Sequence, residues 1–385
     1  MKKIFLLFLS FVFLFCGCAR EENPITAETT RPHKIETEEA SFTGIWLTYS
    51  ELSVKGKSYT EETYRKHIAE LFSSFREKKI NNVFVHVRPF ADAMYYSEIF
   101  ESSEYSSGER GERADFDILR ICTEEAKNSG LKIHAWINPY RVLSVPDAEK
   151  IADGQIKSWL DEKDSAVCIT ESGIYLNPAS QKVTKLITDG IREILLNYDV
   201  DGIHLDDYFY PSDFAYGDQK EYKEYLKSGG ILSLQKFRRE KVSTMLSISY
   251  GTVKSFGEEL VFSVSPSGDI EKNINEIYAD VPLWCKGGYC DMIIPQLYYG
   301  FQNDSMPFEK VLSEWLSLTE NSDVKLVIGL ALYKVGEEDY FAGKGKTEWI
   351  ESNDVIERQI KLTKEKGAFG VSFFSSGYIQ KLNLK

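Results

Sequence analysis

Short apolar segments alternate with longer amphipathic segments from Ser41 to the end of the chain, and this alternation constrains the fold more than any other feature. The apolar segments have the length of strands, and the amphipathic ones have the period of helices. Such alternation is typical of a parallel α/β fold, and eight strands close a barrel. We therefore expect a (β/α)₈ TIM barrel. Its strands are predicted at Gly44–Tyr49, Asn82–Arg88, Lys132–Asn138, Gly202–Asp207, Leu260–Ser265, Met292–Tyr298, Leu326–Tyr333 and Gly370–Ser375.

The segments between the predicted strands also carry helix-ending signals. Gly130 and Gly367 each follow an amphipathic stretch and precede a strand, which is where glycine commonly ends a helix. Because the chain stops soon after the eighth strand, the last helix of the barrel is expected to be truncated. The helices are predicted at Glu61–Lys78, Phe116–Ser129, Gln181–Leu196, Leu232–Tyr250, Phe308–Thr319 and Val355–Lys366.

Two connections are longer than a barrel requires. Residues 91–115 follow the second predicted strand, and residues 140–179 follow the third. Both connections begin at the carboxyl end of a strand, which is the barrel face that carries active sites. We expect these two loops to border a substrate cleft.

The N-terminal segment is not part of the predicted barrel. Two lysines precede an apolar run over residues 4–15, which is the layout of a signal peptide spanning residues 1–17. This run is shorter than the ~20 residues that a membrane-spanning helix needs. Residues 18–40 are polar and lack apolar periodicity, so a flexible tether is expected there. The catalytic domain is predicted over residues 41–385, with no second domain.

The residues after the apolar run indicate how the protein is attached. Gly17 and Cys18 resemble the lipobox of bacterial lipoproteins, in which the cysteine is lipidated before cleavage. This resemblance implies a protein that is secreted across the inner membrane and lipid-anchored in the cell envelope through Cys18, with simple secretion as the alternative. Two acyl chains are sufficient for stable attachment to a membrane.

Composition argues against two classes of partner. The formal net charge is −13 and the acids are spread along the chain, which argues against binding to nucleic acid. Cys122, Cys168, Cys285 and Cys290 form no CxxC pair and have no histidine cluster nearby, so neither a metal nor another cofactor is expected. For Cys285 and Cys290, a disulfide and a pair of buried free thiols are both open.

Polar side chains share one face of several predicted strands. Side chains alternate along a strand, so residues two apart lie on the same face. A purely structural barrel has Val, Ile and Leu toward its axis, and each unsatisfied buried polar group costs about 1–3 kcal/mol. The pattern therefore predicts an active site at the strand ends. The polar set comprises His86, Arg88, His134, Trp136, Asn138, His204, Asp206, Gln296 and Tyr298.

Asp206 is the leading catalytic candidate, because a carboxylate at the mouth of a barrel has few structural uses. A glycosidase needs two carboxyl groups, ~5 Å apart for retention and ~6.5–9.5 Å apart for inversion. Asp207 is adjacent to Asp206, so in regular strand geometry the two side chains point apart. Asp92, on the loop after the second strand, is then the best partner. If the strand end kinks, Asp206 and Asp207 both reach the cleft.

Other residues near the strand ends are predicted to bind substrate. Arg88, Asn138 and Gln296 are expected to hold the sugar in register, and aromatic residues follow the two acids at 208–210. For His86 and His134, which lie deeper in their strands, a core role and a functional role are both open. The predicted substrate-binding set is Arg88, His134, Asn138, Tyr140, Arg141, His204, Tyr208, Gln296, Tyr298 and Tyr333.

Seven segments of the chain resemble the glycosyl-hydrolase-like 10 family, which includes bacterial cell-envelope lipoproteins that act on the glycan strands of peptidoglycan. They follow the family order over essentially the whole predicted domain. The segments are GIWLTY (44–49), VHVRPFADAMYYS (85–97), FDILRICTEEAKNSGLKIHAWINPYRV (116–142), YLNPASQKV (175–183), YDVDGIHLDDYFYP (198–211), VSPSG (264–268) and IIPQLYYGF (293–301).

This resemblance implies a glycosidase on a (β/α)₈ barrel. The segment DGIHLD also resembles the fourth-strand segment of the alpha-amylase clan, whose last Asp is the nucleophile, and that role carries over to Asp206. The clan takes its general acid from a Glu after the fifth strand, where this chain has Ser265, Pro266 and Ser267. The identity of the acid, Asp207 or Asp92, is therefore open.

The predicted function is hydrolysis of a cell-envelope polysaccharide, namely the β-linked glycan strands of peptidoglycan, by paired carboxylates. In one variant of this mechanism the N-acetyl group of the substrate replaces the protein nucleophile. A catalytically silent glycan-binding barrel is an alternative, which the presence of Asp206, Asp207 and Asp92 disfavours. A glycosidase of another polysaccharide, such as an α-linked one, is a second alternative.

Overall fold

A computed structural model describes residues 41–211, 214 and 217–382. Cys18, the predicted signal peptide and the predicted tether lie outside the described residues. Parallel strands close into a barrel in the order β1-β11-β10-β9-β8-β7-β3-β2, so the predicted TIM barrel is confirmed. The strands are β1 (Phe42–Leu47), β2 (Asn82–Arg88), β3 (Lys132–Ile137), β7 (Gly202–Leu205), β8 (Val261–Val264), β9 (Met292–Ile293), β10 (Lys325–Ala331) and β11 (Gly370–Phe374).

The sixth barrel strand differs most from its prediction. β9 ends at Ile293, whereas the apolar pattern extends to Tyr298. Pro295 lacks the N–H that a central strand needs for its ladder, so regular pairing stops before it. Gln296 keeps only isolated bridges, to Ser267 beyond the end of β8 and to Gly329 within β10.

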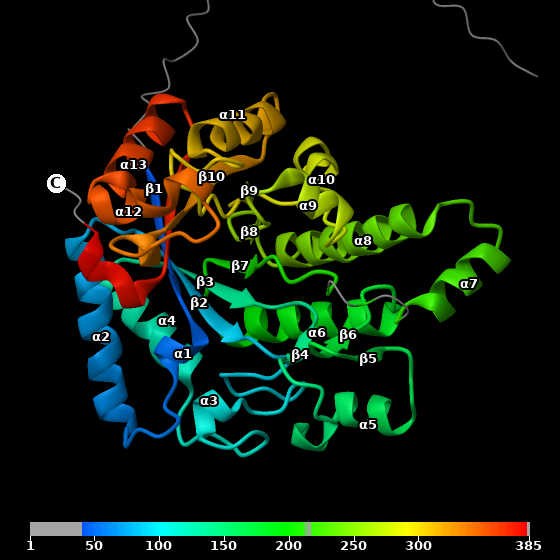
Figure 1. Ribbon diagram of the computed structural model, residues 1–385. Coiled ribbons are helices and arrows are strands. Elements are labelled where there is room, and N and C mark those ends of the chain that lie inside the picture. Colours follow the sequence, from blue (N-terminus) through cyan, green and yellow to red (C-terminus); the bar gives the residue numbers. More distant parts are fainter. Residues whose placement is uncertain (1–40, 212–213, 215–216, 383–385) are drawn as a thin grey trace, which may run out of the picture. The chain divides into compact units, whose positions relative to one another are not determined.

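Helices surround the barrel, as Figure 1 shows. Gly130 ends the helix before β3 in the left-handed conformation, with φ 67°. Within the described part of the chain, β11 leads into a short 3₁₀ helix at Ser376–Lys381, which confirms the truncated last helix. The helices that pack between the strands are α2 (Glu61–Glu77), α4 (Ile118–Ser129), α6 (Gln181–Asn197), α8 (Leu234–Lys254), α11 (Phe308–Thr319) and α13 (Val355–Glu365).

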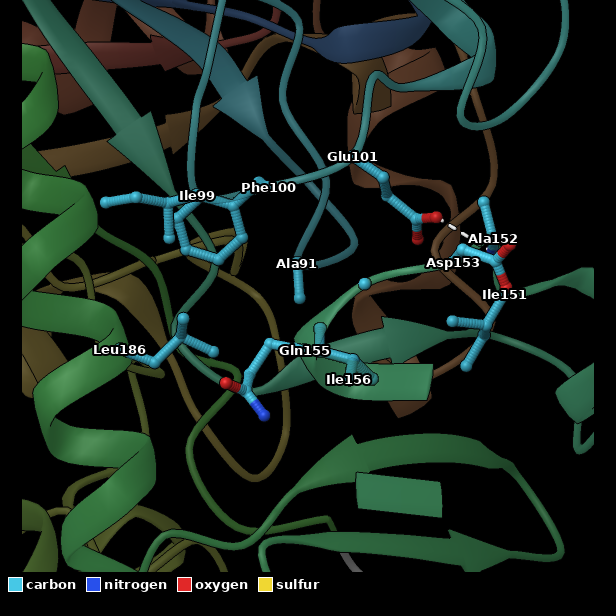
Figure 2. A pocket seen from close by; sticks show the side chains of 11 residues that line it. Ala91, Ile99, Phe100, Glu101, Ile151, Ala152, Asp153, Gln155, Ile156 and Leu186 are labelled. Atoms are coloured by element: carbon cyan, nitrogen blue, oxygen red, sulfur yellow. Dashed lines mark hydrogen bonds between the residues drawn. The ribbon is translucent and has the colours of Figure 1, made fainter. Parts of the chain in front are cut away.

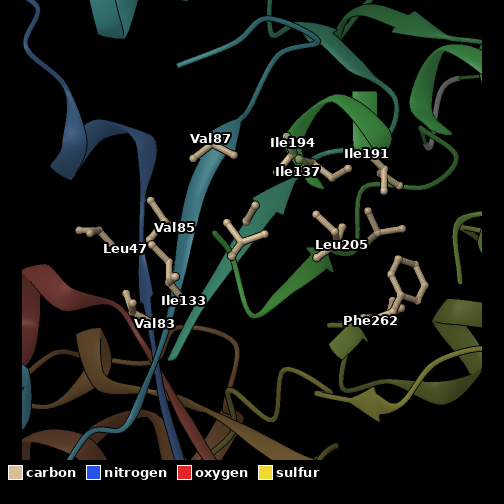
Figure 3. Packing of buried hydrophobic residues seen from close by; sticks show 14 of the residues in the cluster. Leu47, Val83, Val85, Val87, Ile133, Ile137, Ile191, Ile194, Leu205 and Phe262 are labelled. Carbon is tan, nitrogen blue, oxygen red and sulfur yellow. The ribbon is translucent and has the colours of Figure 1, made fainter. Parts of the chain in front are cut away.

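The apolar residues that alternate along the strands pack against these helices. Figure 3 shows Val85 of β2, Ile137 of β3 and Leu205 of β7 together with Ile191 and Ile194 of α6. All of these side chains are fully buried. Full burial of one such side chain stabilises the fold by roughly 1.5–3 kcal/mol, so this layer holds the helices on the barrel. A separate cluster packs inside the barrel and includes Phe42, Trp46, Phe84, Trp136, Met292, Ile294 and Val327.

The two long loops are folded units that the strand and helix pattern did not predict. The loop after β3 forms a small antiparallel sheet of β4 (Arg141–Leu143), β6 (Gly173–Leu176) and β5 (Val167–Thr170). In the loop after β2, Glu101 pairs with Arg110 and accepts a 2.9 Å hydrogen bond from the backbone N–H of Ala152 (Figure 2). The two loops are therefore linked to each other. The cavity between them holds about 20 Å³, which is room for one water rather than a sugar.

Cys285 and Cys290 are both buried free thiols, which settles the choice between a disulfide and free thiols. Both residues belong to the main apolar core. Across the described residues, no helix is both long enough and apolar enough to span a membrane.

Candidate active site

A cleft opens at the carboxyl ends of the barrel strands. It encloses about 280 Å³, close to the lower end of the ~300–1,000 Å³ that is typical of small-molecule sites. Carboxyl, imidazole, guanidinium and aromatic groups all contribute to its walls. The lining residues are Trp46, Thr48, Tyr49, His86, Trp136, Arg141, Asp206, Asp207, Tyr208, Ser265, Gln296, Tyr298 and Phe374.

Asp206 and Asp207 both line this cleft. β7 ends at Leu205, so the two acids follow the strand and are free of its alternation. Asp206 is buried, with 2% of its surface exposed, whereas Asp207 is half-buried. The kinked strand end, and not the regular strand, is therefore the geometry that the structure adopts.

Three donors hold the carboxylate of Asp206. Its Oδ2 accepts hydrogen bonds from Nε1 of Trp136 at 3.0 Å and from Nδ2 of Asn138 at 3.3 Å, and its Oδ1 accepts one from the backbone N–H of Tyr208 at 3.3 Å. Burial and the nearby Asp207 raise the pKa of Asp206 to about 7, although Arg141 and the Trp136 hydrogen bond act in the opposite direction.

Burial also raises the pKa of Asp207, while hydrogen bonding from the Gln296 side chain opposes this shift. Nε2 of Gln296 donates a 3.1 Å hydrogen bond to the carbonyl of Ser265, which places the amide at the end of β8. The charge of Asp207 is, after burial, the second cause of the raised pKa of Asp206, so the two carboxyl groups influence each other. Such a pair can supply one proton donor and one carboxylate near neutral pH.

Aromatic and cationic groups form the walls beside the acids. The guanidinium carbon of Arg141 lies 4.2 Å from the ring centre of Tyr208 and 4.4 Å from that of Phe90. In another part of the wall, the ring of Tyr298 lies 5.8 Å from that of Phe374. Tyr208 is 48% exposed, so part of its side chain is available to a sugar.

The sequence pattern of the glycosyl hydrolase-like 10 family matches residues 41–349. The chain belongs to this family. The glycosyl hydrolase DigH of Escherichia coli strain K12 is 26% identical to it, over 97% of this chain and 92% of DigH. The glycosyl hydrolase YngK of Bacillus subtilis is 28% identical, over 81% of this chain and 64% of YngK.

Solved structures of other glycosidases share the barrel of this family member. The alpha-L-fucosidase isoenzyme 2 of Paenibacillus thiaminolyticus superposes with a TM-score of 0.55 and 14% identity, over 89% of this chain and 47% of the fucosidase. The catalytic domain of beta-amylase from Paenibacillus polymyxa superposes with a TM-score of 0.54 and 10% identity, over 88% of this chain and 92% of the amylase domain. These two likenesses concern the fold alone. With its family membership, the chain is a glycoside hydrolase on a TIM barrel.

Arg88 does not lie in the cleft of this glycosyl hydrolase-like 10 protein, which corrects its predicted role. The register of β2 shifts between His86 and Arg88, so Arg88 pairs with Ile137 on the outer face of β3. Its guanidinium packs 4.6 Å from the ring centre of Phe100. A Cβ on Gly190 of α6 would lie 2.5 Å from a guanidinium nitrogen, so Arg88 fills the space between the barrel and this helix.

Asp92 also lies away from the cleft, so the structure does not bring the predicted partner to Asp206. It is buried in the loop after β2, where its Oδ1 accepts a 3.1 Å hydrogen bond from the backbone N–H of Phe90. Burial raises the pKa of Asp92, and the charge of Arg110 opposes this effect. The carboxyl group that accompanies Asp206 in the cleft is that of Asp207.

Asn138 and Tyr140 stand behind the cleft rather than in its wall. Oδ1 of the buried Asn138 accepts hydrogen bonds from the backbone N–H groups of Tyr140 at 3.3 Å and Arg141 at 2.9 Å. Asn138 thereby orients both Asp206 and the segment that carries Arg141. Tyr140 is fully buried, and within the described part of the chain its hydroxyl has no hydrogen-bond partner.

His134 and His204 are core residues below the cleft, so their predicted contact with substrate is not supported by their position. Nε2 of His204 accepts a 3.0 Å hydrogen bond from the indole of Trp46, and its Nδ1 lies 2.8 Å from Oγ of Ser263. Nε2 of His134 lies 3.0 Å from Oδ1 of Asn82. Burial lowers the pKa values of both histidines, which keeps them neutral.

Tyr333 lies behind the cleft wall. Its ring meets that of Tyr298 edge to face at 5.9 Å, and Tyr298 itself lines the cleft as predicted.

The predicted catalytic and substrate-binding sets omit several lining residues, although alternation already placed Trp136 on the inward face of its strand. Trp46 and Thr48 show the same period at the end of β1. The lining residues outside the predicted catalytic and substrate-binding sets are Trp46, Thr48, Tyr49, His86, Trp136, Ser265 and Phe374, of which His86 and Trp136 belong to the inward polar set.

Proposed function

We propose that this enzyme hydrolyses the glycan strands of peptidoglycan, with Asp206 and Asp207 as its catalytic pair. The observation that carries this proposal is that two consecutive carboxyl groups, both with raised pKa values, line one cleft at the active face of the barrel. Glycosidases need one carboxyl group as an acid and another as a carboxylate. No Glu is available directly after β8, where the chain reads Ser265, Pro266 and Ser267.

The two acids differ in their surroundings, and this difference supports a division of roles. Asp206 is buried and held by three donors, which suits a group that stabilises positive charge at the anomeric carbon, either directly or through the N-acetyl group of the substrate. Asp207 is half-buried and is the acid that donates its proton to the glycosidic oxygen. Water then adds to the anomeric carbon and returns a proton to the pair.

Two further observations support an envelope glycan as the substrate. The exposed ring of Tyr208 and the Tyr298 and Phe374 rings offer apolar faces on which sugar rings stack. The lipobox-like Gly17 and Cys18 would retain the enzyme at a membrane surface beside the wall. Such an anchor would keep the enzyme within reach of the glycan strands of the wall.

The test is a comparison of substrates with mass analysis of the products. The enzyme is incubated with peptide-free peptidoglycan strands, chitin oligosaccharides and α-linked glucans. We expect shortened strands from peptidoglycan, and at least ~10³-fold slower cleavage by Asp206→Asn, which corresponds to about 4 kcal/mol of transition-state stabilisation. Cleavage of α-glucans alone would contradict the substrate, and strand binding without products would identify a silent glycan-binding barrel.

A further inference from the structure

His86 has an unusual position in the cleft. It lies in β2, is 2% exposed and lines the cleft, yet in the described part of the chain neither of its ring nitrogens has a hydrogen-bond partner. Among the described residues, the other buried side chains with unpartnered polar atoms do not line this cleft. A buried polar atom without a hydrogen bond destabilises the fold, so a core histidine normally finds partners, as His204 does.

Aromatic neighbours fix the plane of the His86 ring. Its imidazole stacks on the indole of Trp136 with ring centres 3.6 Å apart and an angle of 7° between the planes. The ring of Tyr49 packs at 5.4 Å and 71°. Stacking occupies the face of the imidazole, whereas the two nitrogens lie on its edge. The same Trp136 indole donates its N–H to Asp206, so one side chain positions both the imidazole and the carboxylate.

The surroundings also keep His86 uncharged. Burial, the guanidinium of Arg141 and the nearby His204 all lower the pKa of His86 well below its usual range. A neutral imidazole offers one N–H donor and one nitrogen acceptor. A sugar hydroxyl both donates and accepts, so it matches this edge better than a carboxylate or an ammonium group does.

We propose that His86 is a substrate-binding residue whose imidazole edge hydrogen-bonds a ring hydroxyl of the sugar held against Asp206, and that it thereby sets which sugar is accepted. The proposal rests on the glycosidase activity and on the position of the acids. It does not depend on peptidoglycan being the polymer. The kinetic tests therefore use whichever glycan the wild-type enzyme cleaves fastest in the substrate comparison.

Two substitutions separate hydrogen bonding from packing. His86→Phe keeps an aromatic ring on Trp136 but removes both nitrogens, and we expect kcat/KM to fall by about 10- to 100-fold with little change in unfolding temperature. His86→Gln restores a donor and an acceptor, so it should recover part of the loss. His67→Phe is the matched control, because His67 stacks on Tyr59 at 5.7 Å outside the cleft. This control should keep wild-type kinetics.

Substrates that lack single hydroxyl groups identify the partner. For the wild type, removal of the contacted hydroxyl should slow cleavage by about 10-fold or more, and in His86→Phe the same removal should have little further effect. Two results would show that His86 only fills space. One is a wild-type kcat/KM in His86→Phe, and the other is that removing any single hydroxyl slows His86→Phe as much as it slows the wild type. If the wild-type enzyme cleaves another glycan but not peptidoglycan, the proposed substrate is wrong. The role of His86 is then tested with that other glycan.

Discussion

The indole N–H of Trp136 lies 3.0 Å from Oδ2 of Asp206 and donates a hydrogen bond to it across two neighbouring barrel strands. Trp136 pairs with His204 in the ladder, so Asp206 projects just beyond the indole at the strand end. The hydrogen bond lowers the pKa of a carboxyl group that burial otherwise raises. Trp136 therefore acts on the charge of the proposed catalytic carboxylate as well as on its position.

Trp136→Phe removes this donor and leaves an aromatic ring to stack on His86. Because a hydrogen bond to a carboxylate contributes about 1.5–3 kcal/mol, we expect kcat/KM at neutral pH to fall by about 10- to 100-fold. The pKa of Asp206 should rise, which moves the acid limb of the activity profile to higher pH. Trp284→Phe is the control, because its indole bonds Oγ of Ser243 away from the cleft. A limb at the same pH in Trp136→Phe and Trp284→Phe would contradict the role of Trp136 in setting the pKa of Asp206.

The raised pKa of Asp206 predicts how activity depends on pH. Asp206 is the proposed carboxylate of the pair, and its pKa is raised to about 7. As the pH falls through this value, Asp206 takes up a proton and no longer stabilises positive charge at the anomeric carbon, so kcat/KM should decline below about pH 7. Initial rates measured from about pH 5 to about pH 9 test this expectation. A level profile through this range would argue against Asp206 as the catalytic carboxylate.

The same raised pKa makes a prediction about stability. The folded protein keeps the proton of Asp206 up to about pH 7, whereas an unfolded chain releases it near 3.8. Between these values the folded state binds more protons, so stability falls as the pH rises through the window. Asp206→Asn removes this cost, and its unfolding temperature should exceed that of the wild type at about pH 8 and approach it near pH 4. Thermal unfolding at both pH values measures the difference, and a variant less stable than the wild type under the alkaline condition would refute it.

Arg88 and Arg141 should respond to truncation in opposite ways. Arg88→Ala leaves a cavity between β2 and α6, so we expect a loss of roughly 2–4 kcal/mol of stability and unchanged kcat/KM in the molecules that remain folded. Arg141→Ala removes a cleft wall stacked on Tyr208, so KM should rise with little loss of stability. Chemical denaturation combined with kinetics separates these outcomes. A kinetic defect in an Arg88→Ala variant that remains stably folded would indicate that Arg88 belongs to the substrate site.

Lipidation of Cys18 would attach the protein to a membrane. If Cys18 carries the lipid, the wild-type protein should enter the detergent phase of a Triton partition, and Cys18→Ser should stay in the aqueous phase. Cys122→Ser is a matched control, because Cys122 is a buried free thiol of the barrel. Identical partition of the wild type and Cys18→Ser would argue for simple secretion.

The order of strands and helices, and the position of Asp206, were predictable from the sequence. Periodicity is a local property, so an unbroken run such as Asn82–Arg88 reveals its strand without knowledge of its neighbours. The carboxyl ends of all barrel strands meet on one face, which places the acid after Leu205 at the active face whatever the details of packing.

Tertiary structure decided which side chains join Asp206. Alternation predicts a face only while every residue stays in the ladder, and the register shift after His86 turned Arg88 to the helices. The end of β7 at Leu205 released Asp207 from alternation and brought it into the cleft. Such shifts depend on pairing with strands that are distant in the chain. For that physical reason, local periodicity located the acids but only the folded barrel determined their partners.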